Sequence, residues 1–256
     1  MAGDGYLIPG STRDVHPAVN GDSYELTIDL DAQTYVQQAL QQAREKSGAK
    51  SASAVVMDSK TGEIVAMGSS DSVDPNGDIE KQLKRKKVFG DRATADSFEP
   101  GSVAKIMTAA AAIQEGKTTP DEVLKVPGSI DMAGVTVKDA WEPGEVPYTT
   151  TGVFGKSSNV GTLMLAERVG EEKMYEYFRK FGVGQAAGVG LPYEVAGYMP
   201  ELNQWSGGTF ANLPIGQGMS MSLLQMTSIY QALANDGVRV EPVSYTHLTL
   251  PTNREV

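Results

Sequence analysis

Residues 97–116, "SFEPGSVAKIMTAAAAIQEG", combine a turn with a helix that begins almost at once. Pro100 and Gly101 supply the turn, and the apolar residues after them recur at helical spacing. Lys105 then falls in the first helical turn, where aligned peptide dipoles already place positive charge, at a cost of about 0.3–1 kcal/mol. The segment therefore predicts a helix whose first turn carries an unfavourable charge that needs a chemical reason. Its predicted buried stripe is Val103, Ile106, Met107, Ala110 and Ala111.

On the N-terminal side, the sequence predicts another helix and a β-hairpin. Asp29 stands at the N-cap position of an amphipathic segment that ends near Gly48. Residues 51–70, "SASAVVMDSKTGEIVAMGSS", contain two apolar runs joined by a short polar connection, which is typical of a hairpin. Because both runs are almost continuously apolar, we expect helices to cover both faces of the hairpin.

On the C-terminal side, residues 118–150 contain four prolines and short β-like pieces, which predict a loop-rich lobe. Helical periodicity returns in residues 159–184 and again in residues 220–237, where Leu223, Met226 and Tyr230 fall on one face. Since helices and strands do not alternate in βαβ order, the pattern favours an α+β architecture over a doubly wound one.

Composition excludes several classes of function. The chain has 256 residues, of which 40% are apolar, so it is large enough for a substantial core. A net charge of −10 argues against a nucleic-acid partner, and we interpret the basic run at 81–87 as a solvated loop face. The absence of cysteine excludes disulfides, thiol nucleophiles and Cys-ligated zinc. No calcium-type loop and no glycine-rich phosphate loop is present, so no cofactor or metal is expected.

Ser102 and Lys105 are three residues apart, which places them on the same face of the predicted helix. One interpretation is that Ser102 merely caps the helix, but a capping box would place Glu or Gln at position 105. The other is that Lys105, held near the positive helix end and desolvated, has a lowered pKa and activates Ser102 as a nucleophile. The spacing alone leaves both interpretations open.

A second serine-containing motif follows in "FGKSSNVGTLML", residues 154–165. Taken alone, Ser157, Ser158 and Asn159 would be another capping cluster at the start of a helix. A Ser-x-Asn motif downstream of Ser-x-x-Lys is, however, a signature of serine acylases that use no histidine. A Ser-His-Asp triad has no credible base, because His16 lies near the N-terminus and His247 in an atypical tail.

With both motifs in place, the chain resembles the transpeptidase domain of class B penicillin-binding proteins, most closely the division-type enzymes of actinobacteria. The resemblance covers about residues 20–242 and includes, in family order, "LTIDLDAQ", "AVVMDSKTGEIVAMGS", "FEPGSVAKIMTAAAA", "YTTTGVFGKSSNVGTLMLAERVG" and "FANLPIGQGMSMSLLQMTSIYQALANDGVRVEP". It implies the fold shared by penicillin-binding proteins and serine β-lactamases, an antiparallel sheet covered by helices, with the C-terminal strands and last helix missing.

The resemblance also implies a role for each motif residue. Ser102 would attack the penultimate D-Ala carbonyl of a peptidoglycan stem peptide and form an acyl-enzyme, which an amine of a neighbouring stem would resolve into a cross-link. Lys105 would accept the serine proton, and Ser157 would relay a proton to the leaving amine. Asn159 would hydrogen-bond Lys105 and the substrate amide. The Ser102 N–H would form half of an oxyanion hole, and β-lactams would acylate the same serine.

The family further implies partners and a location. Its substrates are stem peptides ending in D-Ala-D-Ala, and membrane proteins of the divisome or elongasome would bind the full-length protein. That protein would act at the extracytoplasmic face of the bacterial plasma membrane, whereas this sequence contains no run of about 18 apolar residues and no signal segment.

The family's Lys-Thr-Gly motif should follow the Ser-x-Asn motif, but the one such triplet here, at residues 60–62, lies in the predicted hairpin turn. Residues 243–256, "VSYTHLTLPTNREV", do not resemble the family and look like an adapter-derived end. We therefore expect residues 1–21 to be a remnant of an upstream region, 22–242 a partial transpeptidase domain and 243–256 a non-native tail. We also expect impaired activity, which normal fluorescent-penicillin labelling of this chain would contradict.

Two alternatives remain open. A D,D-carboxypeptidase or β-lactamase-like hydrolase would use the same acylation chemistry but release the acyl group to water, so its penicilloyl adduct would turn over rapidly. A non-catalytic β-lactam sensor or scaffold domain would bind without transfer, and its role would survive Ser102→Ala. The extended match outside the motifs favours the transpeptidase.

Overall fold

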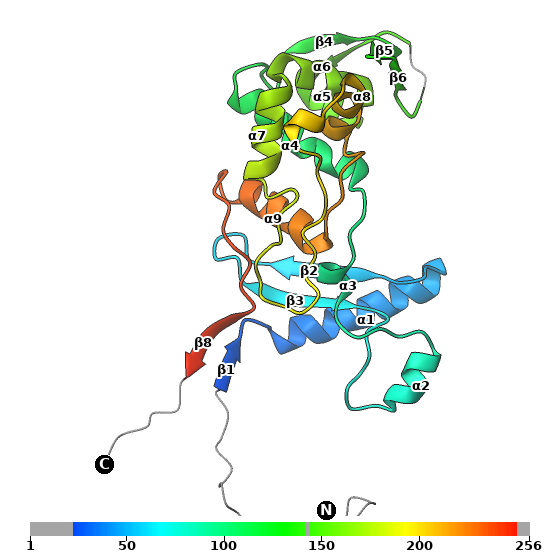
Figure 1. Cartoon of the computed structure of the whole chain (residues 1–256), viewed down its shortest axis with the longest axis vertical. Coiled ribbons are helices and arrows are strands. Elements are labelled where there is room, and N and C mark those ends of the chain that lie inside the picture. Colours follow the sequence, from blue (N-terminus) through cyan, green and yellow to red (C-terminus); the bar gives the residue numbers. More distant parts are fainter. Residues whose placement is uncertain (1–22, 142–143, 250–256) are drawn as a thin grey trace, which may run out of the picture. The chain divides into compact units, whose positions relative to one another are not determined.

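The computed structural model describes residues 23–141 and 144–249, and within them helices combine with antiparallel strand pairs (Figure 1). One compact unit contains residues 27–244. A second pairs β1 (Ser23–Leu26) with β8 (Tyr245–Thr249) in an antiparallel ladder. The mixture of helices and strands confirms the predicted α+β class. Residues 1–21, the predicted upstream remnant, lie outside the described residues.

The predicted hairpin forms from β2 (Ser53–Met57) and β3 (Ile64–Ser69). In its turn, Asp58 Oδ1 accepts hydrogen bonds from the N–H groups of Lys60 (2.8 Å) and Thr61 (2.9 Å). Gly62 has a φ of +78°, which only glycine adopts without strain. The Lys-Thr-Gly triplet therefore serves the chain reversal, as predicted.

Two helices pack on this hairpin: α1 (Leu30–Ser47) contacts β3, and α9 (Leu223–Ala234) contacts β2. Coverage is less complete than expected, because β3 buries alternate residues and Val56 of β2 is 43% exposed. α1 begins at Asp29, which accepts from the Ala32 N–H, and ends at Gly48 as predicted. Leu40 is the only buried residue of α1, so the apolar face expected for this helix is largely exposed.

Two observations refine the expectations for helices in the rest of the chain. The basic run at 81–87, predicted to be a loop face, is partly helical because it overlaps α2 (Ile79–Lys84), and α3 (Arg92–Ala95) follows it. In α9, the buried residues are centred on Leu224, Ser228 and Ile229 and do not include Leu223, Met226 or Tyr230. Polar residues on that buried face find partners in loops; for example, Gln231 Nε2 donates to the Ser59 carbonyl.

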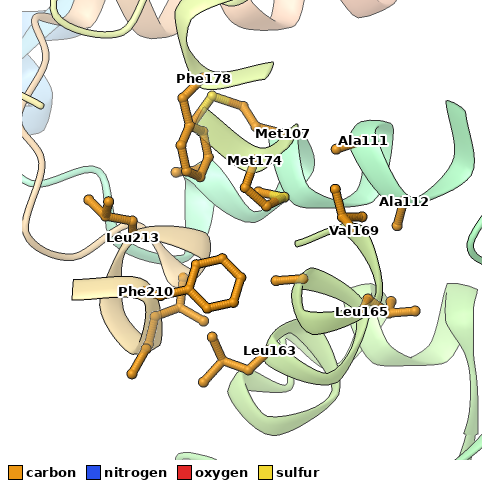
Figure 2. Close-up of a cluster of buried hydrophobic side chains, with 14 of the residues drawn as sticks. Met107, Ala111, Ala112, Leu163, Leu165, Val169, Met174, Phe178, Phe210 and Leu213 are labelled. Atoms are coloured by element: carbon orange, nitrogen blue, oxygen red, sulfur yellow. The ribbon is translucent and has the colours of Figure 1, made fainter. Parts of the chain in front are cut away.

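A helical core supports the segment at 97–116. It contains α4 (Lys105–Gln114), α6 (Asn159–Val169), α7 (Glu171–Lys180), α8 (Gly207–Asn212) and the short helix η3 (Leu213–Ile215). Figure 2 shows side chains from these elements meeting in one cluster. Fully or almost fully buried members include Met107, Leu163, Leu165, Met174, Phe178, Phe210 and Leu213.

The loop-rich lobe at 118–150 is confirmed. It consists of two antiparallel ladders, β4 (Val123–Val126) with β7 (Val146–Thr149) and β5 (Ser129–Met132) with β6 (Val135–Lys138). α5 (Thr150–Gly155) follows and leads to the Ser-x-Asn motif. The strands that the structure describes form four two-stranded ladders rather than one larger sheet. None of the helices in the described ranges is long and apolar enough to cross a membrane.

Candidate active site

The turn before α4 is held by a glycine-rich loop from much later in the chain. Gly101, with a φ of +56°, donates its N–H to the Gly216 carbonyl at 2.9 Å. A Cβ built on Gly216 would lie 2.0 Å from the Gly101 oxygen, so the approach requires glycine. Two residues on, the Gly218 N–H donates to Glu99 Oε1 at 2.9 Å. The turn that presents Ser102 is therefore fixed on both sides.

Ser102 lies in a short 3₁₀ helix, η1 (Gly101–Ala104), rather than at the N-cap expected from the sequence. The residue is exposed, and neither η1 nor α4 has a side-chain cap. Ser102 therefore caps neither helix, and the capping interpretation is wrong. Of the predicted stripe, Met107 and Ala111 are fully buried, whereas Val103, which lies in the 3₁₀ turn, is 43% exposed.

Lys105 is 3% exposed and points toward the Ser-x-Asn motif. Its Nζ donates to the Ser157 carbonyl (2.6 Å), Ser157 Oγ (3.1 Å) and Asn159 Oδ1 (2.6 Å). Burial lowers the pKa of Lys105 to about 8, and the negative charge of Asp139 acts in the opposite direction. The amine therefore combines a near-neutral pKa with a fixed position, both of which a general base needs.

The structure brings three of the four predicted residues into direct contact: Lys105, Ser157 and Asn159. Ser102 lies one turn before Lys105, and no hydrogen bond joins its hydroxyl to the amine in the part of the chain that is described. Such contacts are often long in a free enzyme and shorten when substrate binds. The Ser-x-Asn segment itself is strained, since Ser157 adopts a φ of +56°.

Sequence reasoning missed Asp139, which organises this segment. Its carboxylate accepts hydrogen bonds from Ser158 Oγ (2.8 Å to Oδ2), the Asn159 N–H (2.6 Å) and the Val160 N–H (3.1 Å). The preceding carbonyl, of Lys138, accepts from Asn159 Nδ2 at 2.9 Å. Asp139 lies 20 residues before Asn159 and belongs to neither motif, so only the fold reveals it.

A cavity of about 860 Å³ adjoins the turn. Glu99 and Gly218, whose hydrogen bond ties the turn to the glycine-rich loop, both line it, together with polar residues such as Gln217 and Asn212. A polar recess of this size can hold a peptide or a small polar ligand. Ser102, Lys105, Ser157 and Asn159 are not among the residues that line it. Among the described residues, no group of three or more His, Cys, Asp or Glu side chains could hold a metal ion.

No histidine is among the described residues that hydrogen-bond Lys105, Ser157 or Asn159. His16 lies outside the described residues, and His247 pairs with Glu25 in the β1–β8 ladder of the other unit. The site therefore consists of a serine, a buried lysine, a Ser-x-Asn segment and an aspartate.

Comparison with known proteins agrees with this geometry. The family model "Penicillin binding protein transpeptidase domain" matches residues 52–250. Penicillin-binding protein PbpB of Mycolicibacterium smegmatis is 61% identical over 239 residues, which are 93% of this chain and 37% of that protein. PbpB of Mycobacterium tuberculosis is 62% identical and is covered to 35%. The chain thus spans little more than a third of the length of these relatives.

More distant relatives and solved structures agree. Peptidoglycan D,D-transpeptidase FtsI of Escherichia coli K12 is 34% identical over 231 residues, which cover 90% of this chain and 38% of that protein. A crystal structure of penicillin-binding protein 3 from Mycobacterium tuberculosis with aztreonam has a TM-score of 0.89 and 60% identity. The match covers 94% of this chain and 53% of that one.

Proposed function

Because the chain belongs to the penicillin-binding protein transpeptidase family, we propose that it carries the acylation site of a peptidoglycan D,D-transpeptidase, with Ser102 as the nucleophile. One observation carries the proposal: a buried lysine one turn after an exposed serine, with its amine held by a Ser-x-Asn segment. A helix cap or an ordinary surface lysine does not account for that arrangement.

In the first step, Ser102 Oγ attacks the carbonyl carbon of the penultimate D-Ala, and its proton passes to the neutral amine of Lys105. With a pKa of about 8, roughly a tenth of the Lys105 amines are neutral at pH 7. Collapse of the tetrahedral adduct breaks the C–N bond to the last D-Ala. Ser157 Oγ lies 3.1 Å from Lys105 Nζ and relays the proton from the lysine to the departing amino group.

Asn159 orients both the base and the substrate. Its Oδ1 accepts from Lys105, and its Nδ2 donates to the Lys138 carbonyl. A primary amide has two donors and two acceptor positions, so one donor and one lone pair stay available for the peptide backbone of a stem. The Ser102 N–H supplies one donor to the oxyanion.

The acyl-enzyme then transfers its acyl group to an amine of a neighbouring stem, which regenerates the serine and forms the cross-link. A β-lactam undergoes the same first step. Attack by the serine breaks the C–N bond of the ring, but the freed nitrogen is still joined to the acyl group and therefore does not leave the site. Crystal structures of the Mycobacterium tuberculosis relative contain aztreonam and ampicillin. The 860 Å³ cavity lined by Glu99 and Gly218 lies next to the turn that precedes Ser102, so a stem peptide bound at the serine could extend into it.

The setting proposed for the whole protein follows its relatives. It cross-links peptidoglycan at the extracytoplasmic face of the plasma membrane, together with membrane proteins of the division or elongation machinery. Residues 22–242 form the transpeptidase part of that protein in this proposal, and residues 1–21 and 243–256 lie outside it.

Intact-mass spectrometry with ampicillin tests the proposal. We expect one adduct with the mass of ampicillin, located at Ser102 by peptide mapping and absent from Ser102→Ala. The reaction is followed to its end point rather than at one early time. An adduct that persists after ampicillin is removed excludes a hydrolase, whereas rapid loss of the adduct indicates one. Transfer of the acyl group from a D-Ala-D-Ala peptide to an amine then separates a transpeptidase from a β-lactam sensor. An adduct that also forms on Ser102→Ala contradicts the proposal.

A further inference from the structure

Asp139 differs from the other aspartates that cap helices in this chain. Asp29, Asp78 and Asp91 each accept from a backbone N–H two or three residues ahead, as ordinary N-caps do. Asp139 instead reaches the first turn of α6 from 20 residues away, at the end of β6. It is 7% exposed, so its charge is buried. A buried carboxylate placed from a distant strand is more than a local helix cap requires.

The hydrogen bonds of Asp139 fix the segment that holds the lysine. Its Oδ1 accepts from the N–H groups of Asn159 and Val160, at 2.6 and 3.1 Å. Its Oδ2 accepts from Ser158 Oγ at 2.8 Å, and the same oxygen of Ser158 accepts from the Gly161 N–H. The carboxylate therefore accepts from N–H groups of the first turn of α6, which have no acceptor within the helix. It also binds the side chain of Ser158, the residue between Ser157 and Asn159.

This anchoring bears directly on Ser157. A serine at a φ of +56° persists only where the surrounding contacts determine the backbone. The residue after Ser157 is fully buried and bonded to Asp139 through its side chain. The bonds of Ser158 and Asn159 to Asp139 thus hold the strained backbone, and with it the Ser157 carbonyl and hydroxyl that contact Lys105.

The charge of Asp139 also acts on Lys105. Burial disfavours the ammonium form of Lys105, and the carboxylate of Asp139 favours it, so the pKa of about 8 reflects two opposing effects. Along the chain, Lys138 directly precedes Asp139, and Lys156 directly precedes Ser157. Among the described residues, Asp139 is the one charged group that contributes to the shift of Lys105.

We propose that Asp139 is a positioning residue of the acylation site. Its carboxylate holds the Ser157–Asn159 segment against Lys105 and supplies a negative charge that favours the ammonium form of the lysine. The proposal rests on the proposed function, since it concerns the same site. It assigns no proton transfer to Asp139, which contacts neither Ser102 nor the amine directly.

The test compares wild type, Asp139→Asn and Asp139→Glu, with Ser158→Ala as the matched control. Ser158→Ala removes the hydrogen bond to Asp139 but leaves the carboxylate charge in place. Ampicillin acylation rates are measured by intact mass from about pH 6 to about pH 10, which brackets the Lys105 pKa of about 8. Thermal unfolding establishes that each variant is folded.

We expect Asp139→Asn to slow acylation by about 10²-fold, because a displaced segment misplaces the base. Its rate should also begin to rise at lower pH than in wild type, because the ammonium form of Lys105 has lost its counter-charge. Asp139→Glu should slow acylation without that shift in pH. Ser158→Ala should leave the pH dependence where it is in wild type.

Several results would reject the role of Asp139. One is an Asp139→Asn profile with the wild-type pH dependence, and another is a wild-type rate in Asp139→Glu. A third is loss of folding in both Asp139 variants while Ser158→Ala stays folded, because the residue would then serve folding alone. If the wild type forms no adduct with ampicillin at any pH, the proposed function itself fails, which is a separate outcome.

Discussion

Two lysine-containing segments of this chain, the hairpin turn at 58–62 and the helix start at 102–105, contain similar residues but have different roles. In the hairpin turn, Asp58 accepts from the backbone at Lys60 and Thr61, and the Lys60 side chain is 62% exposed. At the helix start, Lys105 is 3% exposed, and its three hydrogen bonds go to Ser157 and Asn159. The first segment is a turn, and the second has the properties of a reactive site.

The difference shows that burial, rather than the presence of lysine in a motif, gives a lysine the lowered pKa that a general base needs. The Asp58 carboxyl has a lowered pKa because the backbone N–H groups of Thr61 and Lys60 stabilise its charge, which helps to fix the turn. Lys105 is removed from water, which brings its pKa to about 8. Its environment includes a second buried ionisable group, Asp139, which no local sequence pattern supplies.

The strongest test of this comparison replaces each lysine by arginine, which keeps the charge but cannot act as a base near neutral pH. Lys105→Arg should lower the ampicillin acylation rate by about 10²–10⁴-fold, the range typical of a lost general base. Lys60→Arg serves as the matched control and should keep the wild-type rate, because Lys60 is exposed. Equal losses in the two variants would show that burial does not distinguish them.

The pH dependence gives the next largest effect. Below the Lys105 pKa of about 8, the neutral fraction of the amine rises roughly tenfold per pH unit, so the acylation rate should rise in the same way and level off above pH 8. The sign for stability agrees: an unfolded lysine titrates near 10.5, so the free energy of unfolding gains from this group as pH rises from about 8 to 10.5. Rates that fall with pH across this range would contradict the assignment.

Two glycines extend the comparison to the backbone. A Cβ on Gly216 would lie 2.0 Å from the Gly101 oxygen, and one on Gly62 would lie 2.4 Å from the Glu241 oxygen. Both residues have positive φ, so alanine at either position should lower the free energy of unfolding by about 1–3 kcal/mol, measured by urea denaturation. Gly216→Ala should also slow acylation because it displaces the Ser102 turn, whereas folded Gly62→Ala should not.

Much of the fold could be predicted because its signals are local. The N-cap at Asp29, the C-cap at Gly48 and the hairpin turn at Asp58 act within a few residues, and all three are present in the structure. The buried face of α9 was not predictable, because Gln225 and Gln231 satisfy their amides with carbonyls of distant loops. The periodicity of apolar residues therefore identified the helix but did not show which of its residues are buried.

The candidate site shows the same division. Ser102, Lys105, Ser157 and Asn159 were found from spacing, since their motifs are short and recognisable. The 3₁₀ turn at Ser102 was missed because it depends on Gly216. Asp139 was missed because its partners lie 19 to 21 residues away, at the start of α6. Contacts of this kind follow from the packing of β6 against α6, which the sequence does not show.

The smallest expected effect compares two helix caps, one in each region. Asp29→Ala removes the hydrogen bond to the Ala32 N–H at the exposed start of α1 and should lower the free energy of unfolding by about 1 kcal/mol. Ser158→Ala removes the cap of α6 and a bond to Asp139, so its loss should be at least as large. Acylation should slow only in Ser158→Ala, since only that cap supports the segment around Lys105. If acylation also slows in Asp29→Ala under conditions where that variant is fully folded, the hairpin region takes part in acylation and the two regions are coupled.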